Sequence, residues 1–171
     1  MLRSRTIKMR LINEDDAEFI TELRSDEKYN TFLSKSDTSV EAQKEWIRSY
    51  KLKEEAEEQF YFIIERLDGT KCGTVRIYDI REDSFCWGSW ILNQNKTRYA
   101  AIESAFLVYE FGFGKLGFNK CHFEVLKGNQ RVVNFHEKFG AVVIEEDKDN
   151  LYFNISKNAV ENCKKKFGGI I

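Results

Sequence analysis

Strand-like and helix-like hydrophobic patterns follow one another along this 171-residue chain in an order that few folds can accommodate. Apolar residues that alternate with basic ones predict a first strand at residues 6–12. Asn13 is the expected N-cap of a helix that runs to residue 24. Thr38 and Glu41 form a capping-box pattern at the start of a second helix, which runs to about residue 57. Its inward-facing residues are expected to be Trp46, Ile47 and Tyr50.

The rest of the chain is predicted to consist of strands interrupted by two helices. Asp68-Gly69 is a typical hairpin turn between the first two of three antiparallel strands. Gly117 is expected to end a helix that begins near residue 102. The basic segment CKKKFGG near the end is expected to be a solvated tail. The predicted strands cover residues 59–66, 71–80, 84–92, 120–126, 141–147 and 151–156, and the predicted helices cover residues 102–116 and 129–139.

This order predicts an α+β domain with a mixed central sheet of about seven strands and about four helices. The passage from residue 84 to residue 126 is expected to be a parallel, right-handed strand–helix–strand crossover. Ligands of such sheets bind where neighbouring strands diverge, beside the N-terminus of the crossover helix, which here is the loop at residues 93–99. The chain contains no proline and therefore no proline-rich linker, so one domain is expected to span residues 1–171.

Composition excludes several functional classes. The chain has 27 Lys and Arg residues against 28 Asp and Glu residues, so it lacks the excess of basic residues that is typical of nucleic-acid-binding proteins. The four cysteines form no CxxC pair and neither histidine lies at zinc-ligand spacing from a cysteine, so reduced thiols and no metal are expected. No apolar run approaches the roughly 20 residues of a membrane span, and the start lacks the apolar core of a secretion signal. A cytoplasmic protein without a membrane partner is expected.

The order of elements resembles that of the GNAT superfamily of acetyl-CoA-dependent N-acetyltransferases, and the resemblance covers nearly the whole chain. Its most specific part is NQRVVNFHEKFGA, residues 129–141, which is similar to the segment after the family's fifth strand. Asn129 stands at the family's Asn position, His136 at its usual Tyr position and Gly140-Ala141 at its Gly-Phe position. The resemblance implies acetyl-CoA as co-substrate and a small-molecule primary amine as acceptor.

The coenzyme-binding residues are implied by the same resemblance. WGSWIL, residues 87–92, resembles the family strand whose main chain pairs with the pantetheine arm. The family's pyrophosphate loop carries glycines that let the backbone approach phosphate, whereas residues 95–100 keep only the final small residue. Lys96 and Arg98 nevertheless place two positive charges at a helix N-terminus, which favours an anion. The implied residues are Trp90, Ile91, Leu92, Asn95, Lys96, Thr97, Arg98, Tyr99, Ala100 and Asn129.

His136 is the first catalytic candidate. Acetyl transfer to an amine requires removal of a proton from the incoming ammonium and stabilisation of the departing thiolate. Helical spacing places His136 on an inward face with Val132 and Phe139. The resemblance gives this position the role of protonating the thiolate, and the alternative is a core histidine without a catalytic role.

Glu124 is the second catalytic candidate, as the base that deprotonates the amine. It lies in the middle of a predicted strand and shares a face with His122, where a carboxylate is unusual unless it is paired or faces a cleft. The alternative is an ion pair with Arg76 or Arg10. Glu103 is expected to be a surface or helix-end charge. The acceptor-binding candidates are Tyr29, Phe32, Trp87, Ser89 and His122.

The leading functional prediction is an N-acetyltransferase that acts on the amine of a nucleotide-linked amino sugar in surface-polysaccharide or glycan biosynthesis, because the FHEKFGA segment and the final EEDKDNLYFNIS hairpin resemble that group. An acetyltransferase of protein or ribosomal-protein N-terminal amines is the first alternative, and polyamine or antibiotic acetylation follows. The missing loop glycines also allow a catalytically dead binding module. A monomer or homodimer is expected.

Overall fold

The computed structural model describes residues 1–26, 28–29 and 39–169. Within them, eight strands form two antiparallel sheets. The five-stranded sheet has the order β1-β2-β3-β4-β5 and the three-stranded sheet has the order β6-β8-β7. The strands are β1 (Leu2–Arg3), β2 (Ile7–Leu11), β3 (Phe60–Arg66), β4 (Lys71–Tyr78), β5 (Cys86–Leu92), β6 (Lys120–Leu126), β7 (Val142–Glu146) and β8 (Asn150–Ser156).

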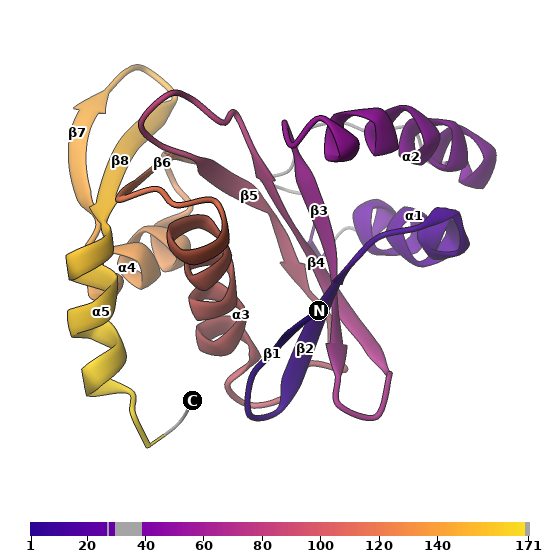
Figure 1. Cartoon of the computed structure of the whole chain (residues 1–171), viewed down its shortest axis with the longest axis horizontal. Helices are drawn as coiled ribbons and strands as arrows, with labels where there is room; N and C mark the ends of the chain where they lie inside the picture. Colours follow the sequence, from indigo (N-terminus) through magenta and orange to yellow (C-terminus); the bar gives the residue numbers. More distant parts are fainter. Residues whose placement is uncertain (27, 30–38, 170–171) are drawn as a thin grey trace.

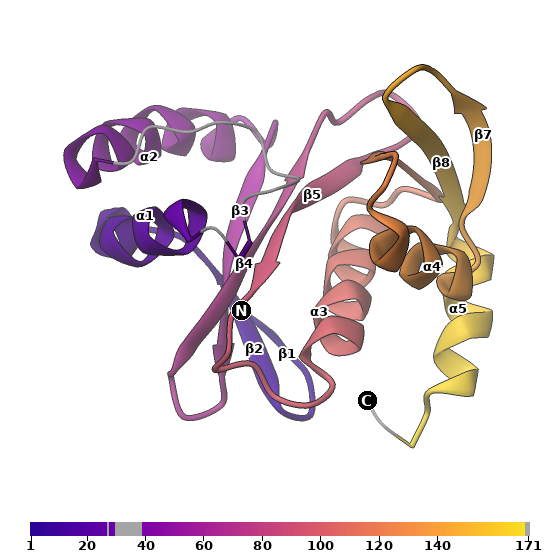
Figure 2. The ribbon, with the colours of Figure 1, turned by 180° about the vertical axis from the view of Figure 1, so that it is seen from behind.

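The helices divide between the two faces of the five-stranded sheet. Two lie on one side, and α3 lies on the other side, between the two sheets (Figure 1). The reverse view shows the same division, with α4 and α5 beside the three-stranded sheet (Figure 2). The bounds are α1 (Ala17–Ser25), α2 (Val40–Glu55), α3 (Ala100–Tyr109), which continues as a π-helical segment (Glu110–Lys115), α4 (Gln130–Phe139) and α5 (Lys157–Lys166). None of these helices is long and apolar enough to cross a membrane.

The predicted α+β class and the order of elements are confirmed, with two additions. The additions are β1, which has only two residues, and α5, which begins after the N-cap Ser156. The segment expected to be a solvated tail is the end of α5, where Cys163 is buried together with Val160. The helical pattern is weak in the sequence, because α5 has few apolar residues and ends in three consecutive lysines.

The start of α2 differs from the prediction. The expected cap, Thr38, lies outside the described residues, and the N-cap is Ser39, whose hydroxyl accepts a hydrogen bond from the Ala42 amide at 3.1 Å. Ile47 and Tyr50 are buried as expected, whereas Trp46 is 37% exposed. The Trp46 ring stacks on Tyr50 and leaves part of its surface to solvent.

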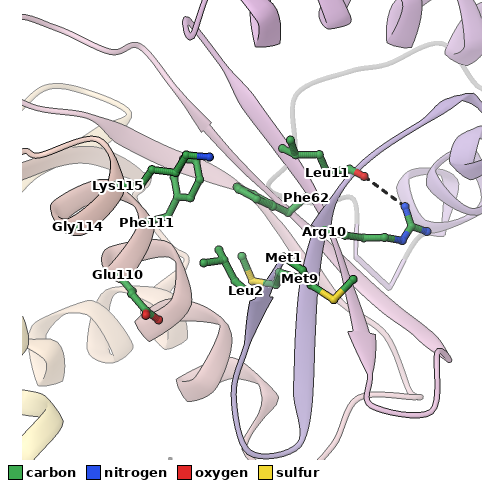
Figure 3. A pocket seen from close by; sticks show the side chains of 10 residues that line it. All are labelled: Met1, Leu2, Met9, Arg10, Leu11, Phe62, Glu110, Phe111, Gly114 and Lys115. Carbon is green, nitrogen blue, oxygen red and sulfur yellow. Dashed lines mark hydrogen bonds between the residues drawn. The ribbon is translucent and has the colours of Figure 1, made fainter.

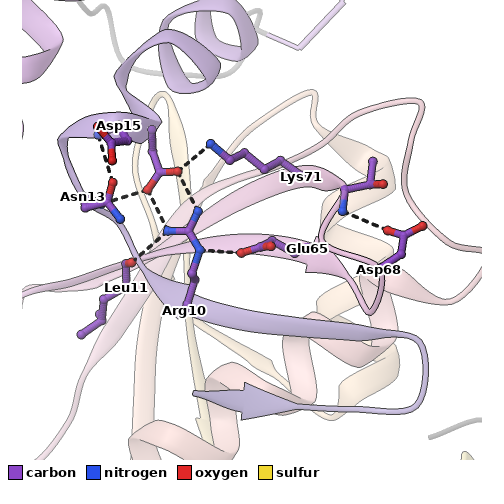
Figure 4. A network of polar contacts seen from close by, with 9 residues as sticks. Arg10, Leu11, Asn13, Asp15, Glu65, Asp68 and Lys71 are labelled. Carbon is purple, nitrogen blue, oxygen red and sulfur yellow. Dashed lines mark hydrogen bonds and ion pairs between the residues drawn. The ribbon is translucent and has the colours of Figure 1, made fainter.

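A buried charge network joins α1 to the five-stranded sheet (Figure 4). Asp16 is fully buried and accepts two hydrogen bonds of 2.8 Å from the Arg10 guanidinium, one of 2.8 Å from Lys71 Nζ and one of 2.9 Å from the Asn13 amide. Arg10 also pairs with Glu65. Burial alone would raise the pKa of Asp16, but the hydrogen bonds from Arg10 and Lys71 outweigh it and hold the pKa at about 2.

One parallel bridge joins the two sheets. Phe85, immediately before β5, pairs in parallel with Cys121 of β6, and the His122 amide donates to the Phe85 carbonyl at 2.8 Å. The predicted parallel crossover is therefore confirmed at this point. Beyond the bridge, β5 and β6 belong to separate sheets, so the predicted mixed sheet is in fact two antiparallel sheets that diverge.

The Phe85 side chain fixes this bridge against the π-helical segment. It is fully buried and its ring contacts Phe113 and Phe118. The ring lies directly against the backbone of Gly112, where an added Cβ would overlap three ring atoms. Only glycine leaves room for the Phe85 ring at this position.

Replacing Gly112 by Ala is expected to lower the free energy of unfolding by about 1–3 kcal/mol, because the methyl group overpacks the core at Phe85. Gly114→Ala is the matched control, since it lies in the same segment and its Cβ would meet nothing within 4 Å. The control should change stability by no more than about 0.5 kcal/mol. Urea denaturation measures both, and equal stabilities would contradict this role for Gly112.

Candidate active site

The candidate site is the gap that opens between β5 and β6 beyond their single bridge. Side chains alternate along each strand, so the gap has two sides. Trp87 of β5 and Phe123 of β6 face α3 and α4, and their ring centroids are 6.3 Å apart. Cys86 of β5 and Glu124 of β6 face the side where α2 lies. Burial, together with the nearby charge of Glu124, raises the pKa of the Cys86 thiol to about 12.

His136 of α4 lies over the gap on the α4 side. Its ring centroid is 5.4 Å from that of Trp87 on β5 and 4.2 Å from that of Phe123 on β6, so it contacts both diverging strands. The rings of Trp90, Phe135 and Phe153 complete the aromatic surroundings. The residue is 5% exposed, and its buried Nδ1 has no hydrogen-bond partner.

This apolar surrounding lowers the pKa of His136 to about 3. The cause is desolvation, because the charged imidazolium would lose its hydration without gaining a partner. His136 is therefore neutral at ordinary pH. A neutral imidazole carries one N–H, so it can donate one hydrogen bond but cannot deliver the proton of an imidazolium.

Because folded His136 is neutral, the free energy of unfolding should depend on pH. An exposed histidine titrates near 6.5, so the unfolded chain binds a proton that folded His136 does not bind as the pH falls from about 6.5 to about 3. Within that window the residue should lower the free energy of unfolding by about 1.4 kcal/mol per pH unit, and above it the effect is absent. Urea denaturation of the native protein and of His136→Phe at pH about 7 and about 5 tests this. The variant should lose less stability, and equal losses would contradict the assignment.

The predicted coenzyme loop is closed by a side chain instead of a glycine. The Asn93 side chain accepts a hydrogen bond from the Asn95 amide at 2.8 Å, and its carbonyl accepts one from the Lys96 amide at 3.1 Å. An Asx turn of this kind imitates a backbone turn. Lys96 and Arg98 are exposed beside the N-terminus of α3, and neither has an ion pair among the described residues.

Glu103 anchors this loop: it lies in the first turn of α3, as a helix-end charge would, but it is not on the surface as the alternative expectation had it. It is fully buried on α3 and accepts hydrogen bonds from the Thr6 amide, at 2.7 Å, and from the Thr6 hydroxyl. Because that hydroxyl gives its hydrogen to Glu103, its oxygen accepts from the Thr97 hydroxyl at 2.7 Å. The coenzyme loop is thereby tied to the segment between β1 and β2.

The other predicted coenzyme residues lie along the same path. Trp90 donates from its indole to the Ser104 hydroxyl at 3.2 Å, and Ile91 is buried on β5. Tyr99 is the residue before α3, and its ring is 5.2 Å from the Arg98 guanidinium. Asn129 is the N-cap residue of α4 but its side chain makes no capping hydrogen bond. Leu92 and Ala100 stand at the end of β5 and the start of α3.

Glu124 is exposed on the α2 side of the gap. The alternative role of Glu124, an ion pair with Arg10 or Arg76, is not supported. Arg10 pairs with Asp16 and Glu65 instead, and no ion pair joins Arg76 to Glu124 within the described residues. Its neighbour His122 is held on both ring nitrogens, by the Ser84 hydroxyl at 2.6 Å and by Asp79 at 2.9 Å.

The predicted acceptor residues are spread over both sides of the gap. The Tyr29 hydroxyl donates to Gln94 at 3.3 Å, so it contacts the coenzyme loop. Trp87 is buried and donates to the Tyr109 hydroxyl at 3.2 Å. Ser89 interrupts β5 with a φ of 47°, near a register shift between β4 and β5. Phe32 lies outside the described residues.

A separate cavity of about 560 Å³ lies between β2, β3 and the π-helical segment (Figure 3). Its walls are mostly apolar, with charged side chains around them. It shares no residue with the gap between β5 and β6 and is not the candidate site. Its lining consists of Met1, Leu2, Met9, Arg10, Leu11, Phe62, Glu110, Phe111, Gly114 and Lys115.

Residues 6–142 match the family model of the acetyltransferase (GNAT) domain. The chain belongs to the GNAT acetyltransferase family. A solved structure described as apo FdhC, a nucleotide-linked sugar GNAT, is 51% identical with a TM-score of 0.91, covering 98% of this chain and 96% of that one. A sequence search among curated proteins gave no match.

More distant members share the fold. The ribosomal-protein-S5-alanine acetyltransferase of Vibrio fischeri is 14% identical with a TM-score of 0.79, over 92% of this chain and 96% of that one. The spermidine N-acetyltransferase of Vibrio cholerae, solved with CoA and spermine, is 18% identical with a TM-score of 0.76, over 91% and 98%. At these identities the likeness concerns the α+β GNAT fold alone.

Proposed function

We propose that this GNAT acetyltransferase moves the acetyl group of acetyl-CoA to the amine of a nucleotide-linked amino sugar. The observation that carries the acceptor class is the 51% identity, over 98% of the chain, to a protein described as a nucleotide-linked sugar GNAT. The gap between β5 and β6 supports the reaction, because it gives two reactants access to one point from opposite sides of the sheet.

Acetyl-CoA is proposed to bind from the α3 and α4 side, along β5 and the loop before α3. Lys96, Arg98 and the amides at the start of α3 would hold its pyrophosphate, since cations and a helix N-terminus both favour anions. Its thioester would reach the gap near Ser89, where the positive φ interrupts regular pairing of β5. His136, with a buried and unpartnered Nδ1, would lie at the sulfur end.

The chemistry follows from the two sides of the gap. On the α2 side, Glu124 accepts the ammonium proton directly or through one water molecule. The amine nitrogen then attacks the thioester carbonyl carbon, the nitrogen loses its second proton to solvent, and the C–S bond breaks as the tetrahedral intermediate collapses. On the α4 side, neutral His136 donates a hydrogen bond to the leaving sulfur, which departs as a thiolate and takes its proton from solvent. The pKa of His136, about 3, implies that His136 adds no high-pH limb to the rate profile.

Replacing Lys96 and Arg98 together with Glu is expected to raise the KM for acetyl-CoA by about tenfold or more, because two favourable charges beside the pyrophosphate become repulsive. The KM for the acceptor should change little. Lys164→Glu with Lys165→Glu is the matched control, since it changes the same charge on exposed residues of α5. An unaltered KM for acetyl-CoA would show that the pyrophosphate lies elsewhere.

Glu124→Gln is expected to lower kcat by about tenfold to a thousandfold, because the amide cannot accept the ammonium proton. The KM for acetyl-CoA should stay near its native value, since Glu124 lies on the other side of the gap. Glu161→Gln, on the exposed face of α5, serves as the control and should retain full activity. Steady-state kinetics measure both, and native kcat in the Glu124 variant would remove it from the mechanism.

The acceptor class itself is tested with a panel. Nucleotide-linked amino sugars should be acetylated with the highest kcat/KM, ahead of spermidine and of a peptide with a free N-terminal alanine. A peptide or polyamine that ranked first would replace the proposal. Thermal denaturation with CoA tests coenzyme binding, because a ligand at a thousand times its Kd stabilises a protein by about 4 kcal/mol, and the absence of any shift would favour the dead module.

A further inference from the structure

Arg76 on β4 is a charged residue that the reaction described above does not use. Strand alternation places it on the α2 side of the sheet, opposite Gly88 of β5. Its guanidinium carbon is 4.6 Å from the ring centroid of Tyr78 and 6.0 Å from that of Trp46 on α2. Its Nε is buried without a hydrogen-bond partner, and no ion pair holds Arg76 in the part of the chain that is described.

The contrast with Arg10 shows that this state is unusual for an arginine in this sheet. Arg10 lies on β2 of the same sheet and has two carboxylate partners, Asp16 and Glu65. A buried polar donor without a partner costs free energy, so it marks a place where a partner is missing. The two aromatic rings orient the guanidinium without neutralising it, and a planar guanidinium matches the oxygens of a phosphate.

The Tyr78 side chain covers the strand partner of Arg76. Gly88 has no side chain, and an added Cβ there would come within 2.9 Å of the Tyr78 hydroxyl, so Tyr78 occupies the space beside Gly88. The pKa of Tyr78 is raised mainly by burial, with Arg76 acting to lower it and Glu124 to raise it. Arg76 and Glu124 therefore both lie within electrostatic range of Tyr78, and strand alternation places both on the α2 side.

We propose that Arg76 binds the diphosphate of the nucleotide-linked acceptor, with Trp46 and Tyr78 holding the guanidinium in place. The proposal rests on the proposed function. A nucleotide-linked amino sugar carries its diphosphate at the anomeric carbon and its amine at another ring carbon, so Glu124 and Arg76, on one side of the gap, would serve the two groups of one acceptor. Arg76 is then a specificity residue that recognises the nucleotide part and takes no part in proton transfer.

The test is the Arg76→Gln variant, with Arg66→Gln as the control because Arg66 is exposed at the far end of β3. Losing a charged hydrogen bond to phosphate should raise the KM for the nucleotide-linked acceptor by about tenfold to a hundredfold. The KM for acetyl-CoA should not change. Calorimetric titration with the nucleoside diphosphates UDP and dTDP should show binding to the native protein and to Arg66→Gln, and none to Arg76→Gln. Arg76→Lys should be intermediate, since it keeps the charge but loses the planar fork.

The outcomes separate the two proposals. Native affinity for the nucleoside diphosphates in Arg76→Gln, with native activity on a nucleotide-linked acceptor, would overturn the role of Arg76 and leave the proposed function standing. A native protein that binds neither nucleoside diphosphate and prefers an amine without a nucleotide would overturn both. Native KM for acetyl-CoA in Arg76→Gln shows that the variant is folded, and Arg76→Lys provides the comparison if it is not.

Discussion

The site depends on the fact that the two sheets touch at one parallel bridge, between Phe85 and Cys121. A second bridge would extend the pairing of β5 with β6 and narrow the gap, while the hydrophobic core that both sheets share helps to hold the three-stranded sheet in place. The bridge is held by packing as well as by hydrogen bonding. The Phe85 ring is buried between aromatic neighbours and the bare backbone of Gly112, so the position of the gap is set by a close steric fit.

The two sides of the gap differ in their electrostatic character, and this difference sorts the reactants. The α4 side is aromatic and keeps His136 neutral, which suits the thioester end of the proposed coenzyme. The α2 side carries Glu124 and Arg76, which has no ion pair among the described residues, and these charges suit the proposed acceptor with its positive amine and negative diphosphate. In the proposed reaction, the sheet thus separates hydrogen-bond donation at sulfur from proton removal at nitrogen.

The sequence predicts the elements well and their long-range contacts less well. Alternation and capping patterns place β2 to β8 and α1 to α4 within a few residues, because these signals are local. The burial of Glu103 depends on Thr6, almost a hundred residues away, and no local pattern encodes that contact. The pKa of His136 likewise depends on burial among rings from three strands and its own helix. The Asx turn at Asn93, in contrast, could be predicted locally, because an Asn side chain readily accepts a hydrogen bond from the amide two residues later.

The hydrogen bonds that join Thr6 to Glu103 and Thr97 couple the stability of the segment before β2 to that of the proposed coenzyme loop. A ligand that orders the loop must also reduce the local opening of that segment, because the two share hydrogen bonds. Amide hydrogen exchange at Thr6 would then slow on coenzyme binding, although Thr6 lies outside the proposed coenzyme loop. The earliest residues of the chain would report on a site assembled from its middle.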